Sequence, residues 1–173
     1  MMNKPAGVVS ATEDRDERTV IDLLGHELSK LGLFPVGRLD KDAQGLMLLT
    51  NDGDFAHRVT SPSKSIYKKY FVTFEGEILP EDIYKFAQGI VLADGTKCLP
   101  AELEGISGGA IVTICEGKYH QVKRMMAAIG KPVICLKRIA IGQLMLDESL
   151  KPGQYCDISD KINLIFAKKV TNM

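Results

Sequence analysis

An acidic side chain stands at a turn directly before an apolar run. The turn is Gly37-Arg38-Leu39-Asp40, and the apolar run that follows at 46–49 ends at Asn51-Asp52-Gly53. Apolar residues bounded in this way by glycine and turn residues predict a buried strand that enters a turn. Asp40 would then lie at the mouth of the core, where a carboxylate is either paired or takes part in chemistry.

Two later segments carry residue types that could act together with Asp40. Tyr70 ends the tripeptide Lys68-Lys69-Tyr70, and the basic pair Lys123-Arg124 lies within 116–126. Taken alone, each of these side chains has an ordinary structural role. Asp40 would be a turn or capping residue, Tyr70 a half-buried strand aromatic, and Lys123 part of a solvated helix face. Only their combination is informative.

The charge of the chain is balanced overall and segregated locally. Lysines plus arginines and acidic residues both number 22, which gives a formal net charge of zero. This balance argues against a protein that coats nucleic acid by bulk charge. A polyanionic partner would have to meet a local patch, and the stretches 58–70 and 118–138 carry several basic residues and no acidic one. A solvated face is the ordinary alternative for each stretch.

Chain length and composition limit the class of protein. With 173 residues, of which 45% are hydrophobic, the chain is long enough for a sizeable core, and we expect one domain over 1–173. The cysteines are too widely separated for a metal-binding pair, so we expect no metal site. We find no secretion signal and no apolar run of membrane-spanning length, so we expect a cytoplasmic protein without membrane contact.

Periodicity and capping residues place the helices. We expect them at 54–59, 80–88 and 119–129. The second begins with Pro80, has acidic residues in its first turn and ends at Gly89. In the third, apolar residues recur at helical spacing and bury one face, which leaves Lys123 and Arg124 to face elsewhere.

Short β-type runs place the strands. We expect strands at 8–10, 34–36, 46–49, 66–75, 133–141 and 144–146, and a meander of short strands with glycine-rich turns over 90–115. Strands grouped in runs with a few helices favour an α+β domain. We therefore expect a mixed, mainly antiparallel sheet with flanking helices.

Four motifs taken together resemble those of RNA pseudouridine synthases, most closely the RsuA branch of the RsuA, RluB, RluE and RluF family. The motifs are Asn3-Lys4-Pro5, Gly37-Arg38-Leu39-Asp40 with the run to Gly53, Lys68-Lys69-Tyr70, and Gln121-Val122-Lys123-Arg124-Met125. They occur in the family's order, and the resemblance extends from Asn3 to about Tyr155. This is far more specific than Gly-Arg-Leu-Asp alone.

The resemblance implies a reaction and a substrate. A uridine within RNA would be isomerised to pseudouridine: the glycosidic carbon–nitrogen bond breaks, the uracil turns, and a carbon–carbon bond forms at C5. The family fold is implied as well, and no metal or organic cofactor is expected. The RsuA branch acts on small-subunit ribosomal RNA, so we expect 16S rRNA, free or in a small-subunit assembly intermediate, as substrate of a monomeric enzyme.

The resemblance also assigns catalytic roles. Asp40 matches the family's essential aspartate, whose carboxylate attacks or stabilises an electron-poor sugar carbon, as in retaining glycosidases. Lys123 matches the basic residue that keeps this carboxylate ionised, with Arg124 as the alternative. Tyr70 matches the active-site tyrosine, which stacks on the uracil and can take part in the final proton removal. We therefore expect Asp40, Tyr70 and Lys123 to be catalytic.

A second set of residues is expected to contact RNA. Arg38 matches the arginine beside the catalytic aspartate, and a long planar cation suits the gap left by a flipped base, or a phosphate. The other expected RNA-binding residues are Lys68, Lys69, Lys118, His120 and Arg124. Sequence spacing suggests no carboxylate partner for His120. Asn3 and Lys4 match an early motif that supports the active-site loop.

The chain departs from the family pattern in two places. The family usually has threonine where this chain has Ala43, which removes a hydroxyl from the turn after Asp40. Relatives also usually begin with a small basic RNA-binding domain of the S4 type. No such segment precedes Met1, so we expect the catalytic domain alone, with a weak grip on ribosomal RNA. An excised domain, a truncated product and a chain that relies on other contacts all fit this expectation.

Three alternatives compete with a small-subunit enzyme. The first is a pseudouridine synthase that acts on large-subunit 23S rRNA, because such relatives share these motifs. The second is a glycoside or nucleoside hydrolase that pairs Asp40 with a second carboxylate such as Asp52, which would leave Tyr70 and the basic helix without a purpose. The third is a catalytically silent RNA-binding remnant, which would not need Asp40.

Overall fold

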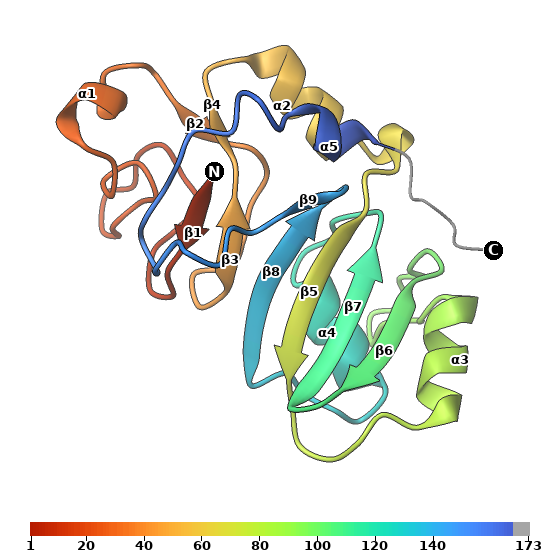
Figure 1. Cartoon of the computed structure of the whole chain (residues 1–173). Helices are drawn as coiled ribbons and strands as arrows, with labels where there is room; N and C mark the ends of the chain where they lie inside the picture. The colour runs from red at the N-terminus through yellow and green to blue at the C-terminus, as the bar shows by residue number, and fades with distance from the viewer. Residues whose placement is uncertain (168–173) are drawn as a thin grey trace.

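The computed structural model describes residues 1–167, which form a seven-stranded sheet with helices on its flanks (Figure 1). The strand order is β1–β3–β8–β5–β7–β6, and β9 pairs with β8. Among these ladders, that of β3 with β8 is parallel and the others are antiparallel. The predicted fold class, a mixed and mainly antiparallel sheet with flanking helices, is confirmed. The strands are β1 (Met2–Lys4), β3 (Gln44–Met47), β5 (Lys68–Thr73), β6 (Glu102–Ile106), β7 (Gly109–Ile114), β8 (Cys135–Ile141) and β9 (Leu144–Met145).

A second, two-stranded sheet joins β2 (Phe34–Pro35) to β4 (Leu49–Thr50). The apolar run at 46–49 is therefore divided between two sheets, with Leu48 at the junction. Its first half pairs with β1 in the large sheet, and its end at Leu49 pairs with β2.

The helices follow their local signals. α2 (Gly53–Thr60) is capped by Asp52, whose carboxylate accepts a hydrogen bond from the Phe55 amide at 3.0 Å. α3 (Pro80–Gln88) spans the predicted range, and α4 (Gln121–Ala128) begins two residues later than predicted. α1 (His26–Ser29), α5 (Asn163–Phe166) and the 3₁₀ turn η1 (Pro62–Lys64) are short. Within residues 1–167, no helix is long and apolar enough to cross a membrane.

The predicted meander over 90–115 is only half right. β6 and β7 form a hairpin, but residues 90–99 make a single isolated bridge between Val91 and Lys97. The segment instead folds back on α3, where the Ala101 amide donates to the Phe86 carbonyl at 3.0 Å. The expected strand at 8–10 is likewise reduced to one isolated bridge, between Val9 and Thr19.

Two buried clusters hold the fold together. The larger lies between the sheet and helices α3 and α4, and includes Val72, Val112, Phe86 and Met126, each fully buried. The smaller lies where α2, β9 and α5 meet, around Leu46, Val59, Ile141, Leu144 and Ile165. Figure 1 shows α4 against one face of the sheet and α3 beside the edge strand β6.

The parallel contact between β3 and β8 depends on Gly45. Its φ angle is +102°, and a Cβ at this position would lie 2.2 Å from the Arg138 carbonyl oxygen. Only glycine permits so close an approach of the two backbones. The contact fixes the loop that precedes β3 beside β8, and it is this loop that carries Asp40.

Candidate active site

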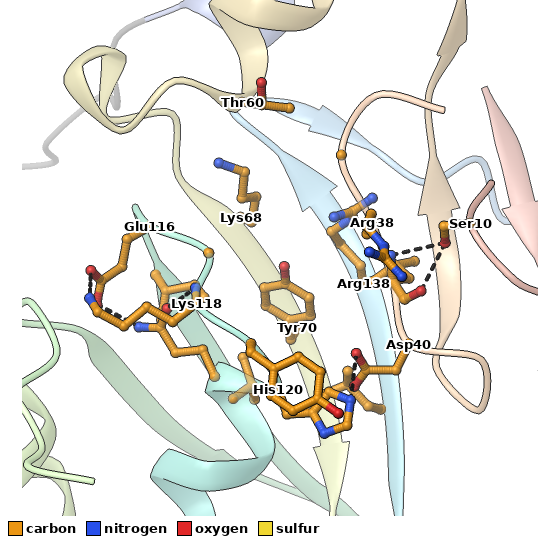
Figure 2. Close-up of a pocket in the computed structure, with 18 of the residues that line it drawn as sticks. Ser10, Arg38, Asp40, Thr60, Lys68, Tyr70, Glu116, Lys118, His120 and Arg138 are labelled. Atoms are coloured by element: carbon orange, nitrogen blue, oxygen red, sulfur yellow. Dashed lines mark hydrogen bonds and ion pairs between the residues drawn. The ribbon is translucent and has the colours of Figure 1, made fainter. Parts of the chain in front are cut away.

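A cavity of about 640 Å³ opens between the loop before β3, strand β5 and the start of α4. Figure 2 shows Asp40 and Glu116 on opposite sides of this cavity, with Tyr70 between them. Seven of the nine predicted site residues line it: Arg38, Asp40, Lys68, Tyr70, Lys118, His120 and Lys123. Lys69 and Arg124 do not.

The buried side chain of Lys4 anchors the loop that carries Asp40. This lysine is fully buried, and its ammonium donates hydrogen bonds to the carbonyl oxygens of Pro5, Lys41 and Ala43 at 2.9, 3.3 and 2.8 Å. Burial lowers the pKa of Lys4 to about 8, although the nearby carboxylates oppose this shift. Lys4 therefore ties the end of β1 to both ends of the turn that follows Asp40.

Ser10 holds the same loop through hydrogen bonds to the backbone of Leu39. Its buried hydroxyl donates to the Leu39 carbonyl at 2.8 Å and accepts from the Leu39 amide at 3.0 Å. The Leu39 side chain is also buried. Because its backbone and side chain are both fixed, Leu39 holds its neighbours Arg38 and Asp40 in place at the cavity, which all three residues line.

The substitution of alanine for the family's usual threonine at position 43 falls within this anchored turn. Ala43 is fully buried, its amide donates to the Asp40 carbonyl at 3.1 Å, and its own carbonyl accepts from Lys4. The turn is therefore closed by backbone bonds and by Lys4, none of which needs a hydroxyl on residue 43.

Asp40 lies between two basic side chains. Its carboxylate oxygens are 3.2 Å from the Lys123 ammonium and 3.4 Å from Nε2 of His120. Sequence spacing suggested no carboxylate partner for His120, and the fold supplies one from the loop before β3. An adjacent cation favours the ionised carboxylate, which is the form that can act as a nucleophile.

Lys123 is shared between two carboxylates. Besides approaching Asp40, it donates to both oxygens of Asp42 at 2.6 and 2.8 Å. Burial works against the charge of Lys123, but the hydrogen bonds to Asp42 and Asp40 outweigh it and raise the pKa of this lysine. Lys123 therefore stays an ammonium at neutral pH. Asp42 was not predicted; its place two residues after Asp40 in the same turn was the available signal.

The start of α4 brings His120 to Asp40. His120 precedes the first helical residue and has a φ angle of +48°, in the left-handed region. Its ring stacks on Tyr119, with ring centroids 3.8 Å apart. The helix was predicted to begin at Tyr119, but this reversal of the backbone delays it to Gln121 and turns the imidazole into the cavity.

Tyr70 stands on the wall formed by the sheet. It is 7% exposed and pairs directly across the ladder with Arg138 of β8. A register shift between Lys69 and Tyr70 breaks the regular pairing at this point, and such a bulge re-aims side chains next to it. Figure 2 shows the Tyr70 hydroxyl on the side of Lys68.

Glu116 organises the opposite wall. This buried carboxylate accepts hydrogen bonds from the Leu99 amide at 2.9 Å and the Gln121 amide nitrogen at 2.6 Å, and it forms an ion pair with Lys118. Burial opposes its ionisation, but these bonds together lower the pKa of Glu116. Lys118, predicted to bind RNA, is thus already engaged by a carboxylate on the cavity wall.

Arg124, the alternative partner for Asp40, is directed elsewhere. Its guanidinium forms an ion pair with Asp94 and donates to the Tyr119 carbonyl at 3.3 Å. The structure therefore places Lys123, and not Arg124, beside Asp40. Lys69 neighbours Tyr70 on β5 but does not line the cavity.

Arg138 is a further cavity residue that sequence reasoning missed, besides Ser10 and Glu116. Arg138 of β8 is 3% exposed, lines the cavity, and donates from Nε to the Leu46 carbonyl at 2.8 Å. It ends the basic stretch 118–138 but belongs to none of the four motifs, and its position opposite Tyr70 depends on strand register. Within residues 1–167, no group of three or more histidine, cysteine or acidic residues is placed to hold a metal ion.

Comparison with known proteins gives a consistent result. A family model described as RNA pseudouridylate synthase matches residues 1–128. The chain is 47% identical over 166 residues to the uncharacterized RNA pseudouridine synthase YtzG of Bacillus subtilis, covering 93% of this chain and 70% of the relative. It is 44% identical over 165 residues to ribosomal small subunit pseudouridine synthase A of Salmonella typhimurium, with the same coverage of 93% and 70%.

The fold is also found among solved structures. A crystal structure of a pseudouridylate synthase superposes with a TM-score of 0.88 at 39% sequence identity, covering 95% of this chain and 71% of that one. The seven-stranded sheet and its flanking helices are therefore those of a pseudouridine synthase fold.

Proposed function

The chain belongs to the RNA pseudouridylate synthase family, and on that premise we propose that it isomerises a uridine of small-subunit 16S ribosomal RNA to pseudouridine. The observation that carries this proposal is the meeting of Asp40, Lys123 and Tyr70 in one cavity. The choice of ribosomal RNA is supported by the 44% identity to ribosomal small subunit pseudouridine synthase A. We assign catalysis to a single domain over the whole described chain.

The first step uses the carboxylate of Asp40. As the glycosidic bond between N1 of the uracil and C1′ of the ribose breaks, the bonding electrons leave with the uracil and C1′ becomes electron-poor. A carboxylate oxygen of Asp40 then bonds to C1′ or stabilises its positive charge. Lys123, 3.2 Å away, places a positive charge beside this carboxylate until the ribose arrives.

The second step uses the ring and the hydroxyl of Tyr70. The detached uracil turns while it stays stacked on the ring, and its C5 bonds to C1′ as the Asp40 oxygen departs. The proton on C5 is then removed and N1 gains a proton, so no atom is gained or lost overall. The phenolic oxygen of Tyr70 faces the cavity and is the group to relay this proton.

RNA is held around the mouth of the cavity. Arg38 is exposed and adjacent to Asp40, where a guanidinium can fill the gap left by a flipped uridine. Lys68, Lys118 and His120 line the same cavity, while Lys69 and Arg124 would meet RNA outside it. Lys118 and His120 would exchange their present carboxylate partners for RNA groups.

A hydrolase fits this site poorly. It would need a second carboxyl group as an acid, and the sequence offered Asp52, which caps α2 and does not line the cavity. The other carboxylate of the cavity wall is Glu116, which is held ionised by Lys118 and so cannot donate a proton. A catalytically silent RNA-binding remnant would not need Asp40, so the presence of Asp40 beside a cation favours an active enzyme over such a remnant.

The proposal is tested by mapping pseudouridine in ribosomal RNA from cells with and without this gene. We expect one 16S site to lose its pseudouridine and to regain it when the gene is restored. A lost site in 23S rRNA would instead establish a large-subunit enzyme. If every ribosomal site were unchanged, the assignment to ribosomal RNA would be wrong.

A further inference from the structure

One end of the cavity carries three cationic side chains: Arg38, Lys68 and Arg138, here called the cationic end. They come from the loop before β3, from β5 and from β8 respectively. Figure 2 shows all three on the side of the cavity towards which the Tyr70 hydroxyl points. The mechanism proposed above requires neither Lys68 nor Arg138.

Arg138 is a buried charge that meets the cavity. It is 3% exposed, and its Nε is held by the Leu46 carbonyl at 2.8 Å, which fixes the plane of the guanidinium. No carboxylate within residues 1–167 lies within ion-pair distance of it. Burial of an unpaired guanidinium is costly, so such residues ordinarily have a carboxylate or a bound anion.

The carboxylates of the cavity are committed to other cations. Asp40 is paired with Lys123 and His120, and Glu116 is paired with Lys118. Neither is left to neutralise the cationic end. A positive site with fixed geometry therefore faces the space that a flipped nucleotide would enter.

Lys68 adds a second charge beside Arg138. Its ammonium donates to the Ile66 carbonyl at 3.0 Å. Burial, and then the positive charge of Arg138, lower the pKa of Lys68 to about 8, so the lysine is still mostly protonated at neutral pH. The half-buried Lys68 and the buried Arg138 repel each other, and an anion placed between them would remove that repulsion.

We propose that Arg138 and Lys68 form a subsite for a phosphodiester group of the target uridine, with Arg38 at its rim. This inference rests on the proposed function in one respect, that the ligand is RNA. A phosphodiester bears a full negative charge in every RNA, whereas the uracil is neutral until its glycosidic bond breaks. The guanidinium of Arg138 can donate to two phosphate oxygens at once.

Mononucleotides test this subsite without any assumption about the RNA target. The dissociation constants of uridine, uridine 3′-monophosphate and uridine 5′-monophosphate are measured by NMR titration at pH 7. We expect one monophosphate to bind the wild-type protein about tenfold more tightly than uridine does. In Lys68→Met this advantage should fall below about threefold, and Lys68→Arg should restore it.

A matched control separates this effect from the loss of any positive charge. Lys30 is exposed and lies outside the cavity, so Lys30→Met should keep the full advantage of the phosphate. The inference is overturned if neither monophosphate binds more tightly than uridine, or if Lys68→Met keeps the advantage. It is also overturned if Lys68→Met lowers kcat on ribosomal RNA and leaves nucleotide and RNA affinity unchanged. The cations would then stabilise the departing uracil and not a phosphate.

The salt dependence of RNA binding supplies a second readout. Loss of one phosphate contact should reduce the slope of log affinity against log salt by about one in Lys68→Met, with no change in Lys30→Met. An unchanged slope in Lys68→Met would count against the subsite. If instead the mononucleotide result holds and no ribosomal RNA site depends on the gene, the subsite stands and only the choice of target RNA fails.

Discussion

The ammonium of Lys123 lies 3.2 Å from Asp40 and 2.6 Å from Asp42, so one cation from α4 joins two carboxylates of the loop before β3. Asp42 is the more exposed of the two, with 73% of its side chain accessible against 24% for Asp40. Lys123 can therefore keep its charge through Asp42 while Asp40 is free to react.

Loss of the Lys123 charge should slow catalysis. We expect Lys123→Met to lower kcat by about 100-fold, because Asp40 would lose its nearest cation, and Lys123→Arg to recover part of the rate. Asp42→Asn should cost less than about tenfold in kcat, since Lys123 would still face Asp40. Single-turnover kinetics on 16S rRNA measure both. If Asp42→Asn lowered kcat as much as Lys123→Met does, the ion pair of Lys123 with Asp42 would be the one that catalysis requires.

Removal of the Tyr70 hydroxyl should separate turnover from binding. Tyr70→Phe keeps the ring that stacks on the base, so the affinity for RNA should change by less than about threefold. The rate of turnover should fall by about 100-fold, because the proton relay is lost. Filter binding and pseudouridine assays on the same RNA provide the comparison. Equal losses in the two assays would argue against a role in proton transfer.

The anchor at Ser10 should matter for both stability and turnover. Ser10→Ala leaves the buried amide and carbonyl of Leu39 without partners, which should cost about 1 to 3 kcal/mol of unfolding free energy. The Asp40 loop would loosen, and kcat should fall with little change in KM. Ser29 is the matched control: it is exposed on α1, and Ser29→Ala should change stability by less than about 0.5 kcal/mol. Equal effects in the two variants would contradict the anchoring role.

Lys68 should reduce the stability of the free protein in a pH-dependent way. Burial and then Arg138 lower its pKa from 10.5 to about 8, so below pH 8 the folded state holds an unfavourable charge. Lys68→Met should therefore be more stable than wild type at pH 7, on the order of 1 to 2 kcal/mol.

The same stability difference should close as the pH rises. Between pH 8 and 10.5 the folded wild type loses this proton while the unfolded chain keeps it, so wild-type stability increases relative to Lys68→Met. The lowered pKa of Lys4 acts equally in both proteins, and the difference isolates Lys68. Urea denaturation of both proteins from pH 7 to 10 measures this difference in unfolding free energy. A gap that stays constant with pH would show that no titrating charge is responsible.

Elements with local signals were predictable from sequence. α3 occupies the predicted range because Pro80 at its start, acidic residues in its first turn and Gly89 after its end all act within a few residues. Residues 90–99 have equally strand-like composition, yet they form only one isolated bridge. A strand exists only where a partner strand is available, and that depends on the whole sheet.

The residues of the candidate site likewise divide into those that the sequence predicted and those that it did not. Asp40, Tyr70 and Lys123 could be identified because each belongs to a short motif of a known family. Arg138 could not, because it reaches the cavity through its pairing with Tyr70 across a register shift. The contact between Asp42 and Lys123 likewise joins segments that the sequence keeps far apart.

The most direct test of the account is the conversion of uridine by an enzyme without its nucleophile. Unmodified 16S rRNA is incubated with purified wild-type protein or with Asp40→Asn, and pseudouridine is mapped along the RNA. Wild type should modify one position, and Asp40→Asn should be slower by roughly 1,000-fold or more, with unchanged Tm and RNA affinity. Formation of pseudouridine by Asp40→Asn at close to the wild-type rate would contradict the account.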